Sequence, residues 1–271
     1  MTGDVKGMKR FLSLGLFVLI LVLHFPAALA DPLPLTADYA DTVTIFYNGE
    51  DSSDGQFIYS YRFPHADPED PTAYLVNTWY DYKIPDTINN DIPNMADNYA
   101  SMYQDVKIDV SYEVTCNGDD FFSVLIHTVT EISEDGELDE MYETWEGNTF
   151  SRLNGKPDQT FSLLNLLGLV DSADTDDWLE EYQTEKASAA VFALVWEEIR
   201  ENPGGLPFDP DFPQEDLETV FNPDRDFYLD RTGNPVFYIL PRDILTEDSR
   251  EGAGLVTFRI SLEEILDEMD L

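Results

Sequence analysis

The block that decides the fold closes the chain: Phe227-Tyr228-Leu229-Asp230-Arg231-Thr232-Gly233-Asn234-Pro235-Val236-Phe237-Tyr238-Ile239-Leu240. Two aromatic and aliphatic runs flank a short polar segment with a glycine, which predicts a strand, a turn and a second strand. Another apolar run at 255–260 predicts a third strand. Ser261 and Glu264 then form a capping box, which predicts a final helix.

The same periodicities predict the elements upstream of this block. Alternating residues predict strands at 42–47 and 56–63, and a meander at 108–151 that turns at Asn117-Gly118 and ends in an edge strand. Helical spacing predicts a helix over 71–102, with a kink or a break at Pro93. The longest helix is predicted at 174–200, with an apolar face made of Trp178, Tyr182, Ala189, Phe192, Trp196 and Ile199. The predicted class is α+β, a mainly antiparallel sheet packed by one long helix and shorter helices.

The N-terminus has the pattern of an export signal. Basic residues in the first ten positions precede an uncharged, mostly apolar run at 11–25, and Ala28-Leu29-Ala30 fits the signal peptidase rule. We expect cleavage between Ala30 and Asp31 and a secreted or extracytoplasmic location. The alternative is an uncleaved membrane anchor, because the uncharged stretch reaches the roughly 20 residues of a spanning helix. The expected organisation is a signal peptide at 1–30, an N-terminal α+β subdomain at 31–151 and a C-terminal subdomain at 152–271.

Acidic residues dominate the composition. The chain has 55 Asp and Glu against 15 Lys and Arg, a formal net charge of −40. Such a surface repels nucleic acid and anionic lipid and attracts cationic partners, although the charge could also serve solubility alone. The candidate contact region is the acidic, Pro-rich connection at 206–226. Its proposed partner-binding residues are Asp209, Asp211, Glu215, Asp216 and Glu218.

No sequence motif indicates a catalytic, cofactor or metal site. Cys116 is the only cysteine, so the chain has no internal disulfide, and it is expected to be a structural strand-end residue. After the signal, the histidines are His65 and His127, with no spacing typical of zinc ligands. The acidic runs fail the EF-hand pattern, which leaves only calcium sites of other kinds open. A carboxylate pair for glycoside cleavage has no specificity among so many acids. We therefore expect a protein without catalytic activity or cofactor.

The order of the C-terminal motifs resembles a known family. These motifs are Thr149-Phe150-Ser151-Arg152-Leu153-Asn154-Gly155-Lys156, then Phe161-Ser162-Leu163-Leu164-Asn165-Leu166-Leu167, the long helix ending at Arg200, and the closing block. This order is similar to the RsiV-like domain, the extracellular part of bacterial anti-sigma-V factors, whose relatives accompany the polysaccharide deacetylase PdaC. Tyr61-Arg62-Phe63-Pro64 more weakly resembles the companion domain found upstream.

Two departures from the family pattern limit what the resemblance implies. The family often has a Gly-Gly-Ala-His segment in the meander, where this chain has Glu134-Asp135-Gly136-Glu137-Leu138-Asp139-Glu140. Few residues precede the apolar run, so we expect an exported sensor module rather than an anti-sigma factor. The resemblance implies a non-enzymatic envelope domain that recognises a cationic protein such as lysozyme. The alternatives are a domain accessory to an enzyme of cell-wall polysaccharide, or a peptidoglycan binder. Contact with a membrane is expected only if the N-terminal segment stays uncleaved.

Overall fold

The computed structural model describes residues 32–47, 55–100, 105–153, 155–156, 159–169, 177–202, 204–250 and 253–270. The predicted signal peptide and its cleavage site between Ala30 and Asp31 lie outside these ranges. Asp31–Leu271 forms one compact unit. Within the described ranges, no helix combines the length and the apolar character that a membrane crossing requires.

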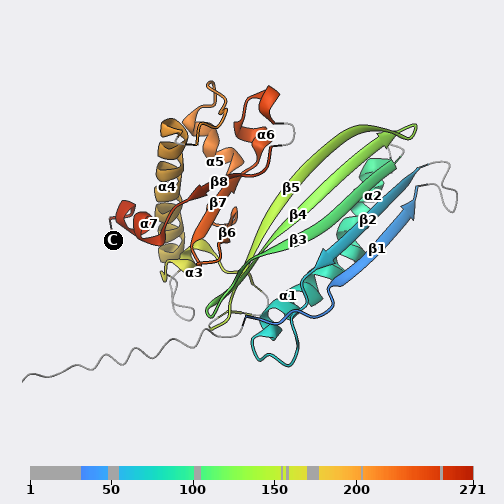
Figure 1. The fold of residues 1–271 in the computed structure, drawn as a ribbon, viewed down its shortest axis with the longest axis horizontal. Coiled ribbons are helices and arrows are strands. Elements are labelled where there is room, and N and C mark those ends of the chain that lie inside the picture. Colours follow the sequence, from blue (N-terminus) through green and yellow to red (C-terminus); the bar gives the residue numbers. More distant parts are fainter. Residues whose placement is uncertain are drawn as a thin grey trace, which may run out of the picture. The chain divides into compact units, whose positions relative to one another are not determined.

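The first sheet has five strands in sequence order (Figure 1). They are β1 (Tyr39–Phe46), β2 (Gln56–Phe63), β3 (Asp105–Asn117), β4 (Phe121–Glu134) and β5 (Glu137–Ser151). The pairing is antiparallel except between β2 and β3, which run parallel. A parallel pair requires a crossover connection, and here two helices, α1 (Ala73–Asp86) and α2 (Ile92–Ala100), supply it. The prediction of an edge strand at the end of the meander is confirmed, since β5 lies at the border of the sheet.

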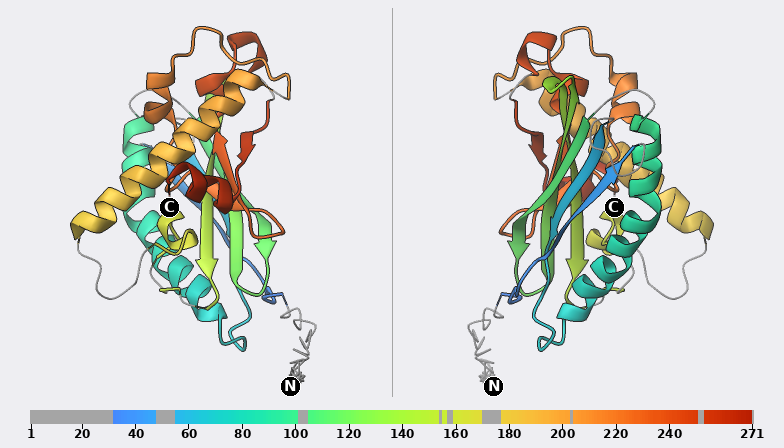
Figure 2. Two further views of the ribbon diagram at one scale, coloured as in Figure 1. Left: turned by 90° about the vertical axis from the view of Figure 1, so that its left-hand side faces the viewer. Right: turned by 90° about the vertical axis from the view of Figure 1, so that its right-hand side faces the viewer.

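One face of this sheet is buried under α1 and α2 (Figure 2). The alternating residues predicted for the second strand place Phe57, Tyr59 and Phe63 in this core. Tyr80 of α1 is fully buried, and its ring lies 5.2 Å from that of Phe63. The helices therefore cover the aromatic face that the sequence pattern indicated.

The helical connection is irregular where prolines interrupt it. A π-helical turn, Thr87–Asp91, separates α1 from α2, and Pro93 is the second residue of α2. Proline has no backbone N–H to donate, and Pro85 near the end of α1 and Pro93 at the start of α2 lie on the two sides of the π-helical turn. At the place where the sequence predicts a kink or a break, the chain stays helical through this π-helical turn, which ends just before Pro93.

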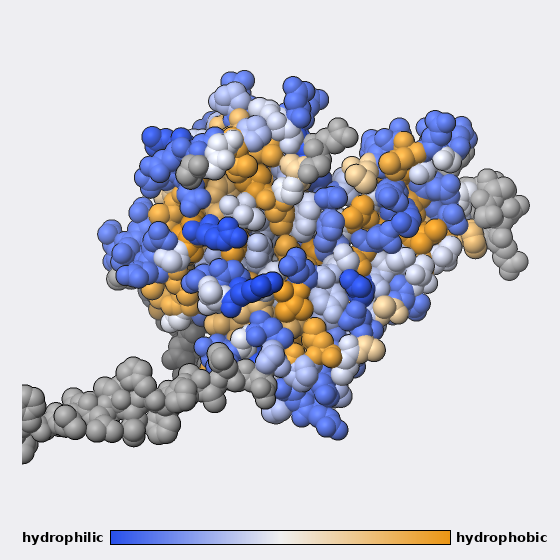
Figure 3. All heavy atoms as spheres, in the orientation of Figure 1, coloured by the Kyte–Doolittle hydropathy of each residue, from blue (hydrophilic) through white to orange (hydrophobic). Residues whose placement is uncertain are grey.

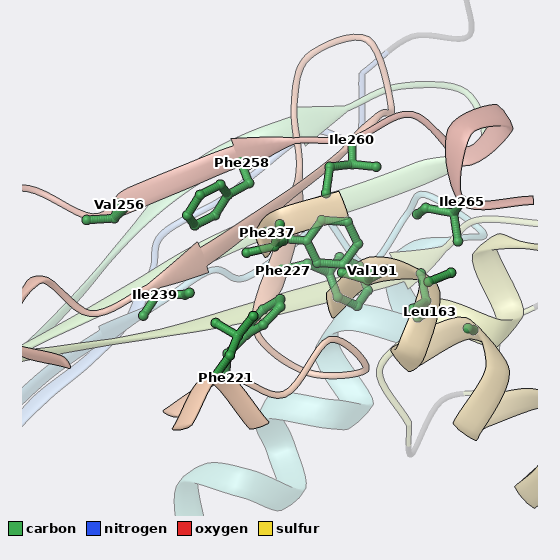
Figure 4. Packing of buried hydrophobic residues seen from close by; sticks show 14 of the residues in the cluster. Leu163, Val191, Phe221, Phe227, Phe237, Ile239, Val256, Phe258, Ile260 and Ile265 are labelled. Carbon is green, nitrogen blue, oxygen red and sulfur yellow. The ribbon is translucent and has the colours of Figure 1, made fainter. Parts of the chain in front are cut away.

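The C-terminal half builds a second, antiparallel sheet with the strand order β6-β7-β8. Its strands are β6 (Phe227–Leu229), β7 (Pro235–Ile239) and β8 (Val256–Arg259), and its helices are α3 (Leu163–Leu166), α4 (Asp177–Glu201), α5 (Leu217–Val220), α6 (Pro241–Ile244) and α7 (Leu262–Glu268). Aromatic and aliphatic residues of the sheet pack with residues of these helices (Figure 4). The predicted capping box is present, because Ser261 and Glu264 bond each other's backbone N–H at the start of α7. The α+β class is confirmed.

The prediction for the face of α4 is partly wrong. Trp178 and Tyr182 are 66% and 51% exposed, whereas Val191, Val195 and Ile199 are buried. Ala189 is exposed as well, and the buried positions include Val191 and Val195 where the pattern selected Phe192 and Trp196, so the predicted face is also partly rotated from the buried one. None of the described residues in the first two turns of the helix is buried in the core of the C-terminal half, which we call the second core. Periodicity shows which residues share a face of a helix, but not how far along the helix its neighbour extends.

The two sheets meet where β5 approaches β6. A Cβ atom added to Gly147 would lie 1.8 Å from the carbonyl oxygen of Phe227, so only glycine permits this approach. The buried Ser123 hydroxyl accepts the N–H of Leu229 at 3.1 Å and also bonds the Thr149 hydroxyl at 2.9 Å. We call these residues the sheet junction. The predicted subdomain boundary at 152 stays a prediction.

Candidate functional site

The five acidic residues predicted to contact a partner lie on one segment, which the fold holds in place. Asp209 donates its N–H to the Ile244 carbonyl at 2.9 Å, and its carboxylate accepts the N–H of Asp211 at 3.0 Å. Glu215 and Asp216 lie in a 3-10 turn, Gln214–Asp216, that continues into α5. Asp211, Glu215, Asp216 and Glu218 are exposed, and Asp209 is half-buried. We call these five residues the acidic loop.

The carboxylates of the acidic loop are not neutralised by any residue that the structure describes. In the part of the chain that the structure describes, none of the five forms an ion pair with lysine, arginine or histidine. Leu217, at the centre of the segment, is buried and anchors it to the second core. The segment therefore presents several negative charges from a fixed backbone.

Other acids of the same connection have a structural role. Asp224 accepts the N–H of Leu163 at 3.0 Å, and burial raises the pKa of its carboxyl group. Asp226 accepts the N–H of Asn222 at 2.7 Å and lies 3.2 Å from the Arg225 guanidinium. Sequence reasoning treated the connection as uniformly acidic, and only the fold separates its surface carboxylates from these inward ones.

A groove of about 480 Å³ lies beside the acidic loop. One side is the border of the first sheet, with Thr144 and Glu146 of β5, and the other is the C-terminal half. The Tyr238 hydroxyl links the two sides, since it accepts the Gly147 N–H at 3.1 Å and donates to the Trp145 carbonyl at 3.3 Å. Sequence reasoning missed this groove because its lining comes from segments far apart in the chain, and no local motif marks it.

Charges of both signs line the groove. Arg225 lies 3.2 Å from Asp226, and Arg242 lies 3.7 Å from Asp243. Burial raises the pKa of Asp243, and the nearby arginines oppose that shift. Glu146 pairs with Lys83 of α1 at 2.6 Å. The groove therefore offers donors and acceptors to a polar ligand.

A stacked pair of aromatic side chains lies beside this groove, on the face of the first sheet opposite α1 and α2. The rings of His127 and Trp145 lie 4.8 Å apart and nearly parallel, and the Nε2 atom of His127 lies 3.5 Å from the Glu143 carboxylate. Cys116 is buried in the second core, and burial raises the pKa of its thiol. Among the described residues, no group of three or more His, Cys, Asp or Glu side chains is placed to hold a metal ion.

Comparison with known proteins identifies the fold. No family model matches the sequence, and no curated protein matches it. Among solved structures, the chain is similar to a member of the DUF3298 family from Bacteroides fragilis, with a TM-score of 0.52 and 11% identity over 87% of this chain and 94% of that one. A DUF3298 family protein from Pseudomonas aeruginosa has a TM-score of 0.45 and 12% identity over 88% of this chain and 94% of that one. The chain thus shares the fold of the Bacteroides fragilis protein, which belongs to a family named as a domain of unknown function.

Proposed function

We propose that this chain is an exported, non-enzymatic binding domain of the cell envelope that recognises a cationic protein, for which lysozyme is the type suggested by the RsiV-like resemblance. The observation that carries the proposal is the acidic loop. Its exposed carboxylates lie on a segment that buried Leu217 and the Asp209–Ile244 backbone bond hold in place. A fixed array of like charges attracts a basic surface without first having to be ordered.

The net charge of the protein adds to this local attraction. A formal charge of −40 accelerates encounter with a cationic protein at low ionic strength. Salt at 0.15 M shortens the screening distance to about 8 Å, so the contribution of remote charges falls. Binding to lysozyme is therefore expected to weaken steeply as the salt concentration rises.

The experiment is a titration of the 31–271 protein with lysozyme over a range of salt concentrations. The test variant carries Asp211→Asn, Glu215→Gln, Asp216→Asn and Glu218→Gln. The matched control removes the same charge from exposed positions of α4 by Glu180→Gln, Glu181→Gln, Glu185→Gln and Glu197→Gln. The loop variant, which keeps general attraction only, is expected to bind about tenfold more weakly than the control, which keeps the loop carboxylates. Absence of lysozyme binding by the natural sequence at low salt would remove the proposal.

A second candidate function is binding of cell-wall polysaccharide, alone or as an accessory domain of an enzyme. The groove favours it, because Thr144, Arg242 and Asp243 offer the hydrogen-bonding groups that sugar hydroxyls require. Sedimentation with insoluble peptidoglycan tests this function, with Arg242→Ala as the variant expected to stay in solution. Equal sedimentation of the natural protein and the variant would argue against the groove as a sugar site.

A further inference from the structure

The outer border of β5 is an open edge of the first sheet. In the described part of the chain, β5 forms a hydrogen-bonded ladder with β4 alone, and β6, which approaches it at Gly147, does not pair with it. Tyr238 bonds the Gly147 N–H and the Trp145 carbonyl, which places those groups on the side away from β4. Since backbone groups alternate along a strand, the N–H and C=O groups of Glu143 and Met141 lie on the same outer side.

The side chains of β5 are mostly acidic, and two exposed apolar side chains lie among them. The acids of β5 are Glu137, Asp139, Glu140, Glu143 and Glu146, and the strand has no lysine or arginine. Leu138 and Met141 are 59% and 57% exposed. They pair with Ser133 and Glu131, which are two residues apart on β4, so they share one face of the sheet. Figure 3 shows hydrophobic residues among the hydrophilic ones on the face that it draws.

We propose that the free edge of β5 accepts an extended, basic segment of the partner protein as an added strand. The backbone of that segment would pair with Met141 and Glu143, its basic side chains would lie near the acids of β5, and its apolar ones near Leu138. Edge addition of this kind takes affinity from main-chain hydrogen bonds and specificity from alternate side chains. The inference rests on the proposed function and specifies how the cationic partner is held.

The free edge of β5 runs along the strand into the groove. Thr144, Trp145 and Glu146 of the same strand line it, so a segment that follows β5 from its start reaches the groove. Tyr238 occupies the edge from that point onward. The open length, 137–144, spans about 26 Å in extended conformation.

The acidic side chains of β5 favour this edge over the other border of the sheet, and they favour a basic strand as its partner. Acidic side chains on an edge strand oppose pairing with a second copy of the same edge, because like charges would meet. The same charges favour a basic strand. The other border of the sheet, β1, has Asp41 as its only acid and no basic residue, so it lacks this selectivity. Among the described residues, Lys83 is the one lysine or arginine that pairs with an acid of β5, and its partner Glu146 lines the groove.

The test compares Met141→Pro with Met141→Ala. Proline removes the N–H of residue 141, which faces outward, so the pairing with β4 is retained while the edge is blocked. Alanine removes the same side chain and keeps the N–H. Equal thermal midpoints for the two variants verify the fold. In a lysozyme titration at low salt, Met141→Pro is expected to bind about tenfold more weakly than Met141→Ala. The proline variant loses the hydrogen bond from residue 141 to the added strand and weakens the adjacent ones.

The outcomes separate this inference from the proposed function. Equal binding of lysozyme by both variants would overturn the proposal of strand addition at β5 and leave the proposed function intact. If no variant binds lysozyme, the proposed partner is wrong. An octapeptide of alternating lysine and valine then tests whether the edge of β5 accepts a basic strand. Slower amide exchange at Met141 and Glu143 with that peptide would support edge pairing, and unchanged exchange would overturn it.

Discussion

The sheet junction is largely buried and tightly packed, whereas the acidic loop is mostly exposed to solvent. At the junction, Gly147 leaves no room for a Cβ atom, and Ser123, which is fully buried, bonds two partners. On the acidic loop, Asp211 and Glu218 are exposed and form no ion pair with any described residue. Stability thus depends on contacts that tolerate no change, and the proposed recognition depends on charges that the fold does not use. Substitutions at the two regions should separate the two properties.

The largest loss of stability is expected for Gly147→Ala. Its Cβ would lie 1.8 Å from the Phe227 carbonyl oxygen, which forces β6 away from β5. Overpacking against backbone is expected to cost about 3 kcal/mol of unfolding free energy. Urea unfolding measures it. Gly118→Ala is the control, because its nearest neighbour is the Cys116 sulfur at 3.9 Å, an ordinary contact. Equal stability of the two variants would contradict the close approach.

A smaller loss is expected for Ser123→Ala. The substitution leaves the N–H of Leu229 and the hydroxyl of Thr149 without their partner in a buried position. An unsatisfied buried donor costs about 1–3 kcal/mol. Ser60→Ala, which removes an exposed hydroxyl bonded to Thr42, should change the unfolding free energy by less than about 0.5 kcal/mol. A cost at Ser123 as small as that at Ser60 would show that the junction bond contributes little.

Two carboxylates outside both regions should give opposite pH dependence. The Thr72 hydroxyl and N–H, with Arg152, lower the pKa of Asp70, so its stabilisation is present above the unfolded pKa and lost as pH falls through the folded one. Burial raises the pKa of Asp224, so its stabilisation is present below the unfolded pKa of about 3.9 and lost as pH rises through the folded one.

Asparagine substitutions test this difference against the natural sequence. As pH rises from 3 to 7, Asp70→Asn is expected to lose stability relative to the natural protein, and Asp224→Asn to gain it. Both changes should stay within about 1 kcal/mol, because neither carboxyl group is fully enclosed. Thermal unfolding at a series of pH values measures them. Two slopes of the same sign would mean that one of the two environments is wrongly assigned.

The elements that local chemistry fixes could be predicted from the sequence. The alternation at 56–63 and the capping box of Ser261 and Glu264 depend on neighbours within a few residues, and both are present. The parallel pairing of β2 with β3 could not be predicted, since it depends on the crossover by α1 and α2. The contact of Gly147 with Phe227 is likewise set by residues far apart in the chain.

The candidate site divides in the same way. Exposure of Glu215 and Glu218 follows from a polar stretch of the connection, in which apolar Leu217 is the residue that is buried. The inward position of Asp224 does not follow, because its partner Leu163 lies in another element. The groove depends wholly on such distant pairs. Composition predicted the character of the surface, and only the fold shows which acids belong to it.

The smallest effect on stability is expected for the acidic loop itself. Asp211→Asn, Glu215→Gln, Asp216→Asn and Glu218→Gln together should change the unfolding free energy by less than about 1 kcal/mol, because exposed charges contribute little to stability. The sign should be stabilising at low salt, where the removal of like charges relieves repulsion in a protein of net charge −40. Urea unfolding at low and high salt measures both the size and the sign. A loss as large as that of Ser123→Ala would mean that the loop supports the fold, and its carboxylates would then no longer be free for a partner.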